Sequence, residues 1–229
     1  MFTSVQLSRA ILKSYFTVCR RSFDIKGIEY LPVGPKIIAM NHTPGCDPLY
    51  LPFVLSDTPH FLLQNATFTI PVIGWLLKQT GQIPVQRGTE KAREAVVQAC
   101  SILRDGGTIA IFPEGRDVEY GTRIPAKTGA VRMALETGAP IIPVGLFVPP
   151  HSLTPLRFHW QGSERTGAWQ FSGKSYMRFG SAWHPNPCSD IHSETEELMN
   201  RIYLLVSEAE RDSRCAVGPL LNLEGGLAR

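Results

Sequence analysis

His42 and Asp47 stand five positions apart in the segment NHTPGCD, which follows an apolar run at residues 36–40. A neutral imidazole can accept a proton from a hydroxyl, and a carboxylate bonded to its other nitrogen would fix the tautomer and stabilise the imidazolium. A turn through the intervening Pro-Gly pair can fold the two side chains together, whereas on a helix they would diverge. The spacing therefore predicts a general base with an orienting partner. The structural alternative is a loop histidine followed by a helix capped by Asp47.

Charged residues also follow two further apolar segments. Arg87 comes after QIPV and precedes a glycine, where its guanidinium could bind a phosphate or carboxylate bidentately. The segment TIAIFP leads into acidic and basic residues around a glycine, and backbone N–H groups near such a glycine suit anions. Ordinary exposed loop residues are the alternative for each position. The candidate binding residues of these two clusters are Arg87, Glu114, Gly115, Arg116 and Lys127.

Apolar periodicity predicts that strands alternate with helices. The expected strands are residues 36–40, 82–85, 108–113 and 140–148. One helix is expected to begin at Asp47, and three more are expected at residues 70–81, 89–107 and 128–138. This alternation implies right-handed crossovers and a single α/β domain with a mostly parallel central sheet flanked by helices. The three polar clusters should therefore meet at the carboxyl ends of the strands.

Two further expectations concern the second half of the chain. Residues 169–173 and 175–180 are expected to form a hairpin or an edge pair. A last amphipathic helix should turn Leu198, Ile202, Leu205 and Ala209 inward. The residues from 214 to 229 are expected to form a loosely ordered tail.

Composition limits the class of protein. With 229 residues, 43% hydrophobic and 19% charged, the chain can bury one sizeable core. Five scattered cysteines without a C-x-x-C pair argue against a disulfide framework, and no set of side chains has the spacing of known metal ligands. A net charge of +3 is too small to suggest nucleic acid. The longest charge-free window, residues 58–77, contains prolines and amides, so no transmembrane span is expected.

The first 22 residues are expected to form an amphipathic helix, ahead of a domain covering residues 23–213. Residues 1–40 hold six basic and two acidic side chains, whereas residues 190–212 hold seven acidic and two basic ones. Such a helix could lie in a membrane interface, with its basic face attracted to anionic lipid. The alternative is a helix docked on its own domain, since most amphipathic helices pack on cores.

Taken together, the motifs resemble the glycerolipid acyltransferase family, typified by bacterial 1-acyl-sn-glycerol-3-phosphate acyltransferases. NHTPGCD is similar to the family's N-H-x4-D block, GQIPVQR to its second block, FPEG to its third and PIIPV to its fourth, in family order. The resemblance covers about residues 23–150. It implies transfer of a fatty acyl group from an acyl-CoA or acyl-carrier-protein thioester to a lyso-glycerolipid hydroxyl, without a metal or other cofactor. The expected acceptor is 1-acyl-sn-glycerol-3-phosphate, at the cytoplasmic side of a membrane to which the protein binds peripherally.

The resemblance also implies roles for individual residues. His42 would be the general base and Asp47 its orienting partner, while Arg87, with Glu114 and Gly115, would form the wall that binds the acceptor and its phosphate. FPEG is followed here by Arg-Asp rather than by the family's Thr-Arg. Either Arg116 substitutes for the family arginine or the acceptor carries another head group. Two alternatives remain, a thioesterase-type hydrolase that uses the same His/Asp pair on water, and a catalytically silent protein that binds membranes or partners.

Overall fold

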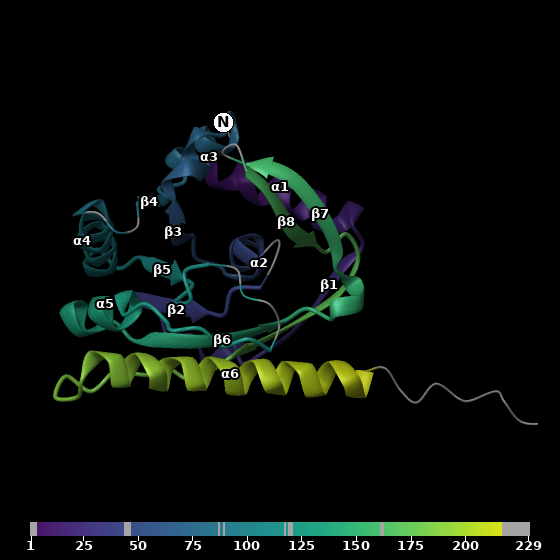
Figure 1. Ribbon diagram of the computed structural model, residues 1–229. Helices are drawn as coiled ribbons and strands as arrows, with labels where there is room; N and C mark the ends of the chain where they lie inside the picture. Colours follow the sequence, from purple (N-terminus) through teal and green to yellow (C-terminus); the bar gives the residue numbers. More distant parts are fainter. Residues whose placement is uncertain are drawn as a thin grey trace, which may run out of the picture.

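A seven-stranded sheet with helices on both faces forms the body of the protein (Figure 1). The computed structural model describes residues 4–43, 47–86, 88, 90–116, 118, 121–160 and 163–216. Across the sheet, the strands are β1 (Arg21–Lys26), β9 (Gly173–Phe179), β6 (Ile141–Phe147), β2 (Lys36–Met40), β5 (Thr108–Ile111), β3 (Pro59–Gln64) and β4 (Ile83–Val85). The strands from β6 to β4 are mutually parallel, and β9 and β1 run in the opposite direction. The predicted α/β class with a mostly parallel sheet is confirmed.

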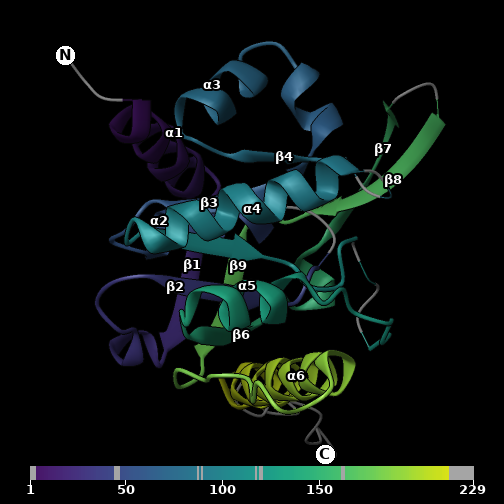
Figure 2. The ribbon, with the colours of Figure 1, turned by 90° about the vertical axis from the view of Figure 1, so that its left-hand side faces the viewer.

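Helices pack on both faces of this sheet (Figure 2). One face carries α4 (Glu90–Arg104), α5 (Gly129–Thr137) and α6 (Ile191–Ala216), and the other carries α1 (Ser4–Val18) and α2 (Asp47–Val54). Strand β2 serves both cores, because successive side chains of a strand point to opposite faces. Ile37 and Ala39 join the core beneath α4, α5 and α6, whereas Ile38 and Met40 join the core beneath α1 and α2. The continuous apolar sequence of its residues 37–40 is therefore that of a central strand in a parallel sheet.

Most predicted elements are confirmed. The expected strand at residues 36–40 coincides with β2, and the helix expected at residues 70–81 is α3 (Ile73–Gln79). The helix α5 ends, as predicted, where Gly138 adopts a left-handed conformation. Three short 3₁₀ helices lie in the connections: η1 (Ile28–Tyr30), η2 (Asn65–Thr69) and η3 (Pro150–Ser152). In α6, three of the four residues expected to face inward, Leu198, Ile202 and Ala209, are fully buried, and Leu205 is half-buried.

The predicted pairing of residues 169–173 with residues 175–180 is wrong. Strand β8 (Ser163–Trp169) pairs instead with β7 (Thr154–Trp160), in a two-stranded ribbon that curves away from the main sheet (Figure 1). Strand β9 lies between β1 and β6, where its residues 175–179 are buried. Gln170, which lies in the connection between β8 and β9, accepts hydrogen bonds from buried Arg21 and from Ser175. A strand pattern shows that a segment is extended but does not identify its partner, and here burial on both faces placed β9 inside the sheet.

The helix α1 docks on the domain. Phe16 is buried and packs its ring against Phe23, Tyr50 and Phe53, while Arg9 donates hydrogen bonds to the backbone carbonyls of residues 55–57. Docking nevertheless leaves apolar side chains of α1 in solvent. These are Leu7, Ile11 and Val18. No helix within the described residues is long and apolar enough to cross a membrane.

The C-terminal boundary differs from the expectation. Helix α6 continues to Ala216, so the proposed tail boundary at residue 214 falls inside a helix. The remaining residues, 217–229, lie outside the described part of the chain.

Candidate active site

The loops that follow β2 and β5 meet at one edge of the sheet. The two strands are parallel neighbours, so their carboxyl ends emerge side by side. The backbone N–H of His42, after β2, donates a 2.5 Å hydrogen bond to Oε2 of Glu114, after β5. The backbone N–H of Val118 donates to the carbonyl of His42 at 3.3 Å. The first and third predicted clusters are therefore in direct contact.

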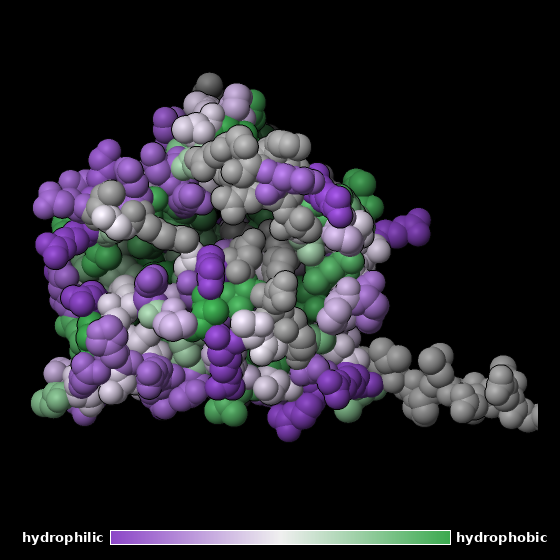
Figure 3. Space-filling model, in the orientation of Figure 1, coloured by the Kyte–Doolittle hydropathy of each residue, from purple (hydrophilic) through white to green (hydrophobic). Residues whose placement is uncertain are grey.

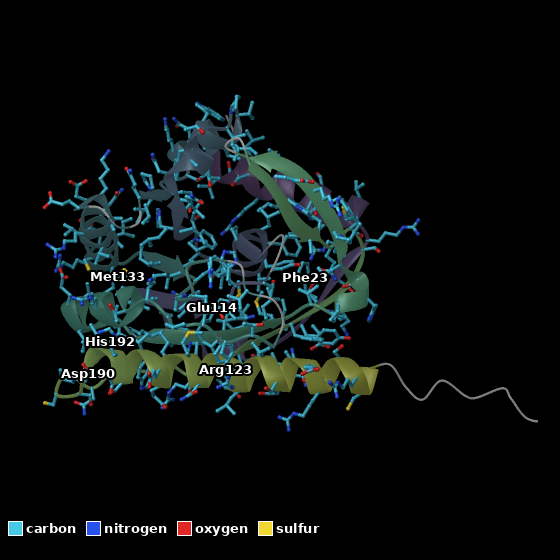
Figure 4. All side chains as sticks on the ribbon, viewed as in Figure 1. Phe23, Glu114, Arg123, Met133, Asp190 and His192 are labelled. Atoms are coloured by element: carbon cyan, nitrogen blue, oxygen red, sulfur yellow. The ribbon has the colours of Figure 1, made fainter. Side chains whose placement is uncertain are left out.

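Glu114 also bonds to the last helix. The residue is only 4% exposed, and its Oε1 accepts a 2.8 Å hydrogen bond from the hydroxyl of Tyr203 on α6. The guanidinium of Arg123 lies over the Tyr203 ring, 4.5 Å from its centroid. Figure 4 places Glu114 in the middle of the molecule and Arg123 beside α6. One buried carboxylate thus ties together the two loops and α6, and charge-assisted hydrogen bonds of this kind are strong.

The pKa of Tyr203 is raised well above its ordinary value. Burial of the ring is the main cause, and the hydrogen bond to Glu114 and the negative charge of that carboxylate act in the same direction. Arg123 opposes the shift. Tyr203 therefore remains protonated at neutral pH and acts as the hydrogen-bond donor in this contact.

The imidazole of His42 lies against an aromatic wall. Its ring stacks on Phe112, with 4.4 Å between centroids and 29° between the planes, and Phe112 in turn stacks on Phe61 at 6.2 Å. Stacking engages the face of the imidazole, whereas proton transfer uses the nitrogen atoms on its edge. The half-buried imidazole thus lies beside an apolar surface.

Asn41 fixes the position from which the His42 loop leaves the sheet. Its buried side-chain amide donates to the carbonyl of Leu146 at 3.0 Å and accepts from the N–H of Leu146 at 2.7 Å. Both bonds join the end of β2 to β6. Asn41 therefore positions the start of the His42 loop. In the sequence, only its place between the strand and His42 indicated this role.

A tight turn directs Glu114 inward. The N–H of Gly115 donates to the carbonyl of Phe112 at 2.9 Å, and Gly115 has a φ of 71°, in the region that favours glycine. The backbone N–H of Lys127 donates to the carbonyl of Pro113 at 2.7 Å and so holds the next segment against this turn. The side chains of Arg116 and Lys127 are exposed. They could therefore meet a soluble or membrane-borne anion without displacing buried groups.

Two predicted site residues cannot be placed with the others. Arg87 and the side chain of Asp47 lie outside the described residues. The backbone of Asp47 begins α2, as predicted from the sequence, and this position is compatible with both the orienting role and the capping role. The strand β4, which precedes Arg87, is parallel to β2, so its carboxyl end lies at the same edge of the sheet. Among the described residues, no group of three His, Cys, Asp or Glu side chains could hold a metal ion.

Tyr203 is a site residue that the sequence did not predict. It lies 89 residues after Glu114, inside an amphipathic helix whose pattern accounts for its ring as a packing residue. No motif marks a hydroxyl of this kind. Only the packing of α6 under the sheet brings it to the carboxylate.

A family model described as Acyltransferase matches residues 22–146, more than half of the chain, so the chain belongs to the acyltransferase family. It is 32% identical over 143 residues to the 1-acyl-sn-glycerol-3-phosphate acyltransferase of Borreliella burgdorferi, over 62% of this chain and 57% of that relative. It is also 32% identical over 126 residues to the chloroplastic 1-acyl-sn-glycerol-3-phosphate acyltransferase BAT2 of Brassica napus, over 54% of this chain and 36% of the relative. The match thus spans between about a third and somewhat more than half of the length of these curated relatives.

One further sequence relative and one solved structure are also similar to this chain. The lyso-ornithine lipid O-acyltransferase of Rhodobacter capsulatus is 28% identical over 116 residues, covering 48% of this chain and 41% of that relative. The crystal structure of the 1-acyl-sn-glycerophosphate acyltransferase PlsC from Thermotoga maritima superposes with a TM-score of 0.68 and 21% identity, over 91% of this chain and 79% of that chain. At this identity the structural match shows a shared fold. The recognition of an acyltransferase from the four blocks is confirmed by the family match.

Proposed function

We propose that this protein transfers a fatty acyl group from an acyl-CoA or acyl-carrier-protein thioester to the free hydroxyl of 1-acyl-sn-glycerol-3-phosphate, giving phosphatidate. The observation that carries the proposal is the contact between His42 and Glu114, which joins two of the four family blocks at one edge of the sheet. The names of the relatives from Borreliella burgdorferi and Brassica napus support this choice of acceptor.

In the proposed reaction, His42 accepts the proton of the acceptor hydroxyl while the oxygen attacks the thioester carbonyl. A new C–O bond forms and a tetrahedral oxyanion develops, for which backbone N–H groups are suitable donors. The C–S bond then breaks, and the imidazolium returns its proton to the departing thiolate. Asp47 would hold the imidazole in the tautomer that this sequence of steps requires.

Cationic side chains would bind the acceptor head group. Arg87 is the proposed phosphate ligand, since a guanidinium can bind two phosphate oxygens at once. Arg116 and Lys127 are exposed beside the Glu114 turn and would add positive charge there. Glu114 and Gly115 would shape this side of the site, with the Glu114 carboxylate acting through the backbone of His42.

The test is turnover of 1-acyl-sn-glycerol-3-phosphate by the purified full chain with each thioester donor in turn. His42→Ala should lower kcat by about 10²–10⁴, the usual contribution of a general base. His192→Ala, at an exposed position near the start of α6, is the matched control and should retain wild-type turnover. Undiminished turnover by His42→Ala would exclude the proposed base. Release of free thiol at the same rate with and without acceptor would support the hydrolase alternative instead.

Another lyso-lipid acceptor is the second candidate. It is favoured by the Arg-Asp pair after FPEG, where the family pattern has Thr-Arg, and by the similarity to a lyso-ornithine lipid O-acyltransferase. A panel of lyso-acceptors with different head groups, followed by mass analysis of the products, separates the two candidates. Selective acylation of a lyso-lipid without a phosphate would favour the second.

We also propose that the protein binds peripherally at the cytoplasmic side of a membrane, where its lipid substrate lies. The outward apolar side chains of α1 support this proposal. Deleting the helix is a poor test, because Phe16 belongs to the core and its loss would destabilise the fold. Substitutions of the outward residues avoid that difficulty.

A further inference from the structure

A strained turn projects an apolar side chain into solvent ahead of α3. Val72 has φ 65° and ψ −53°, and the N–H of Ile73 donates to the carbonyl of Pro71 at 2.7 Å, which closes a γ-turn. This turn is rare, and a positive φ is particularly unfavourable for a β-branched residue. The side chain of Val72 is 76% exposed, so it gains little from packing. Strain that packing does not explain is a reason to look for a function.

The residues after the turn extend the same apolar surface. Ile73 is 48% exposed and Trp75 is 54% exposed. Gly74, between them, faces the protein: a Cβ there would lie 2.1 Å from the carbonyl oxygen of Phe68, at the adjacent η2. Close approach of α3 to η2 at Gly74 therefore directs its two apolar neighbours away from the core.

The outward residues of α1 lie close by. Helices α1 and α3 are in contact, and both lie at the end of the molecule opposite α6 (Figures 1 and 2). On α1, the exposed residues Leu7, Ile11 and Val18 follow helical spacing and so share one side of that helix. The two helices thus expose apolar side chains at the same end of the protein.

Charge is distributed unevenly along the same axis. Lys13 on α1, Arg20 just after it and Lys78 on α3 are exposed. At the opposite end, residues 190–212 carry seven acidic and two basic side chains, and the edge formed by α6 is mostly hydrophilic (Figure 3). A charge distribution of this kind would favour approach of the α1–α3 end to an anionic surface.

From these observations we propose that the γ-turn at Val72 and the start of α3 insert into the interfacial layer of an anionic bilayer, next to α1. Val72, Ile73 and Trp75 would enter the layer, and the nearby lysines would contact lipid phosphates. The inference rests on the proposed function: the protein would need to reach a bilayer because the acceptor and the product of that reaction are membrane lipids. It assigns to the segment between the first two family blocks a lipid contact in addition to that of α1.

Binding to vesicles without donor or acceptor tests this surface separately from catalysis. The probes are phosphatidylcholine vesicles with and without phosphatidylglycerol, and the readout is co-sedimentation of the full chain. Trp75→Ser should weaken binding to the anionic vesicles by about tenfold, the value of one large apolar side chain. Leu204→Ser, at an exposed apolar position on α6, is the matched control and should bind as the wild type does.

Val72→Gly gives a second test that misfolding cannot mimic. Glycine adopts a positive φ without strain, so this variant should unfold at a higher temperature than the wild type and yet bind anionic vesicles less tightly. Addition of vesicles should also shift the Trp fluorescence of the wild type to shorter wavelength, and Trp75→Phe should lose most of that shift. Equal vesicle binding by wild type, Trp75→Ser and Val72→Gly would overturn the proposal. A dimer that both substitutions dissociate, with vesicle binding unchanged, would assign the surface to a second copy of the chain instead.

Discussion

The backbone N–H of His42 donates a 2.5 Å hydrogen bond to the carboxylate of Glu114, although the two residues are 72 positions apart. The bond makes a residue of the third family block a structural support for the loop of the first block. Since the Tyr203 hydroxyl holds the other oxygen of the same carboxylate, the position of the imidazole depends on a helix outside the family match.

Glu114→Gln should impair catalysis more than binding. The amide keeps the size of the side chain but replaces one of the two accepting oxygens by an NH2 donor, so the bonds from His42 and Tyr203 cannot both be accepted in their present positions. We expect kcat to fall roughly tenfold to a hundredfold, because small displacements of a catalytic group have effects of this size, with KM for the acyl donor little changed. Steady-state kinetics at saturating acceptor measure the effect. A rise in KM with kcat unchanged would instead indicate direct contact between Glu114 and a substrate.

Tyr203→Phe should reproduce part of that loss. It removes the hydroxyl but keeps the ring beneath Arg123, so the expected loss of stability is about 1.5–3 kcal/mol, the value of one hydrogen bond to a buried charged group. If Tyr203 acts through Glu114, the kcat effects of Tyr203→Phe and Glu114→Gln will not add in the double variant. Tyr176→Phe, on β9, is the control and should leave kcat unchanged. Additive effects on kcat would show that the two side chains act independently.

Asp57→Asn should lower stability in a pH-dependent way. The ammonium of Lys36, itself buried, donates a 2.6 Å hydrogen bond to Asp57 and holds the pKa of that carboxyl below its ordinary value of 3.8. Because the folded-state pKa is depressed, the stabilisation is fully present above pH 3.8 and is lost as the pH falls through the folded value. We expect a loss of about 1–2 kcal/mol at pH 7.

Urea unfolding of wild type and Asp57→Asn over a range of pH measures this difference. The gap in unfolding free energy should be constant from pH 5 to pH 7, where the carboxyl is ionised, and should shrink below about pH 4. Glu197→Gln, which removes an exposed pair with Arg201, should change stability little at any of these values. A difference in unfolding free energy as large at pH 2 as at pH 7 would contradict the assigned ion pair.

Cys100 should resist thiol reagents in the native protein. Burial, helped by the nearby Glu136 carboxylate, raises the pKa of its thiol to about 11, so at pH 8 only about one molecule in a thousand carries the reactive thiolate. Cys188 and Cys215 are exposed and should be alkylated first. Peptide mapping after brief alkylation, with and without urea, tests the difference. Labelling of Cys100 at the rate of Cys188 in the native state would contradict its burial.

The family blocks were predictable from sequence because each is short and contiguous. His42, Glu114, Gly115 and Arg116 follow directly after apolar strands, and the structure places all four at the carboxyl edge of the sheet. The roles of Asp47 and Arg87, whose side chains lie outside the described residues, stay predictions. Of the two alternatives for α1, docking on the domain through Phe16 is confirmed, whereas contact with a membrane stays a prediction; the helix also exposes a second apolar side. A single-helix pattern cannot separate these cases, since it records hydrophobicity without recording what covers it.

The sequence by itself determined the elements with strong local periodicity, such as β2 and α4, and through them the α/β class. Only the tertiary structure decided that β9 lies inside the sheet, that Tyr203 reaches Glu114, and that the apolar surface around Val72 stays open. The reason is physical. Backbone periodicity is set by neighbouring residues, whereas strand partners, buried hydrogen bonds and exposed patches depend on contacts between segments far apart in the chain.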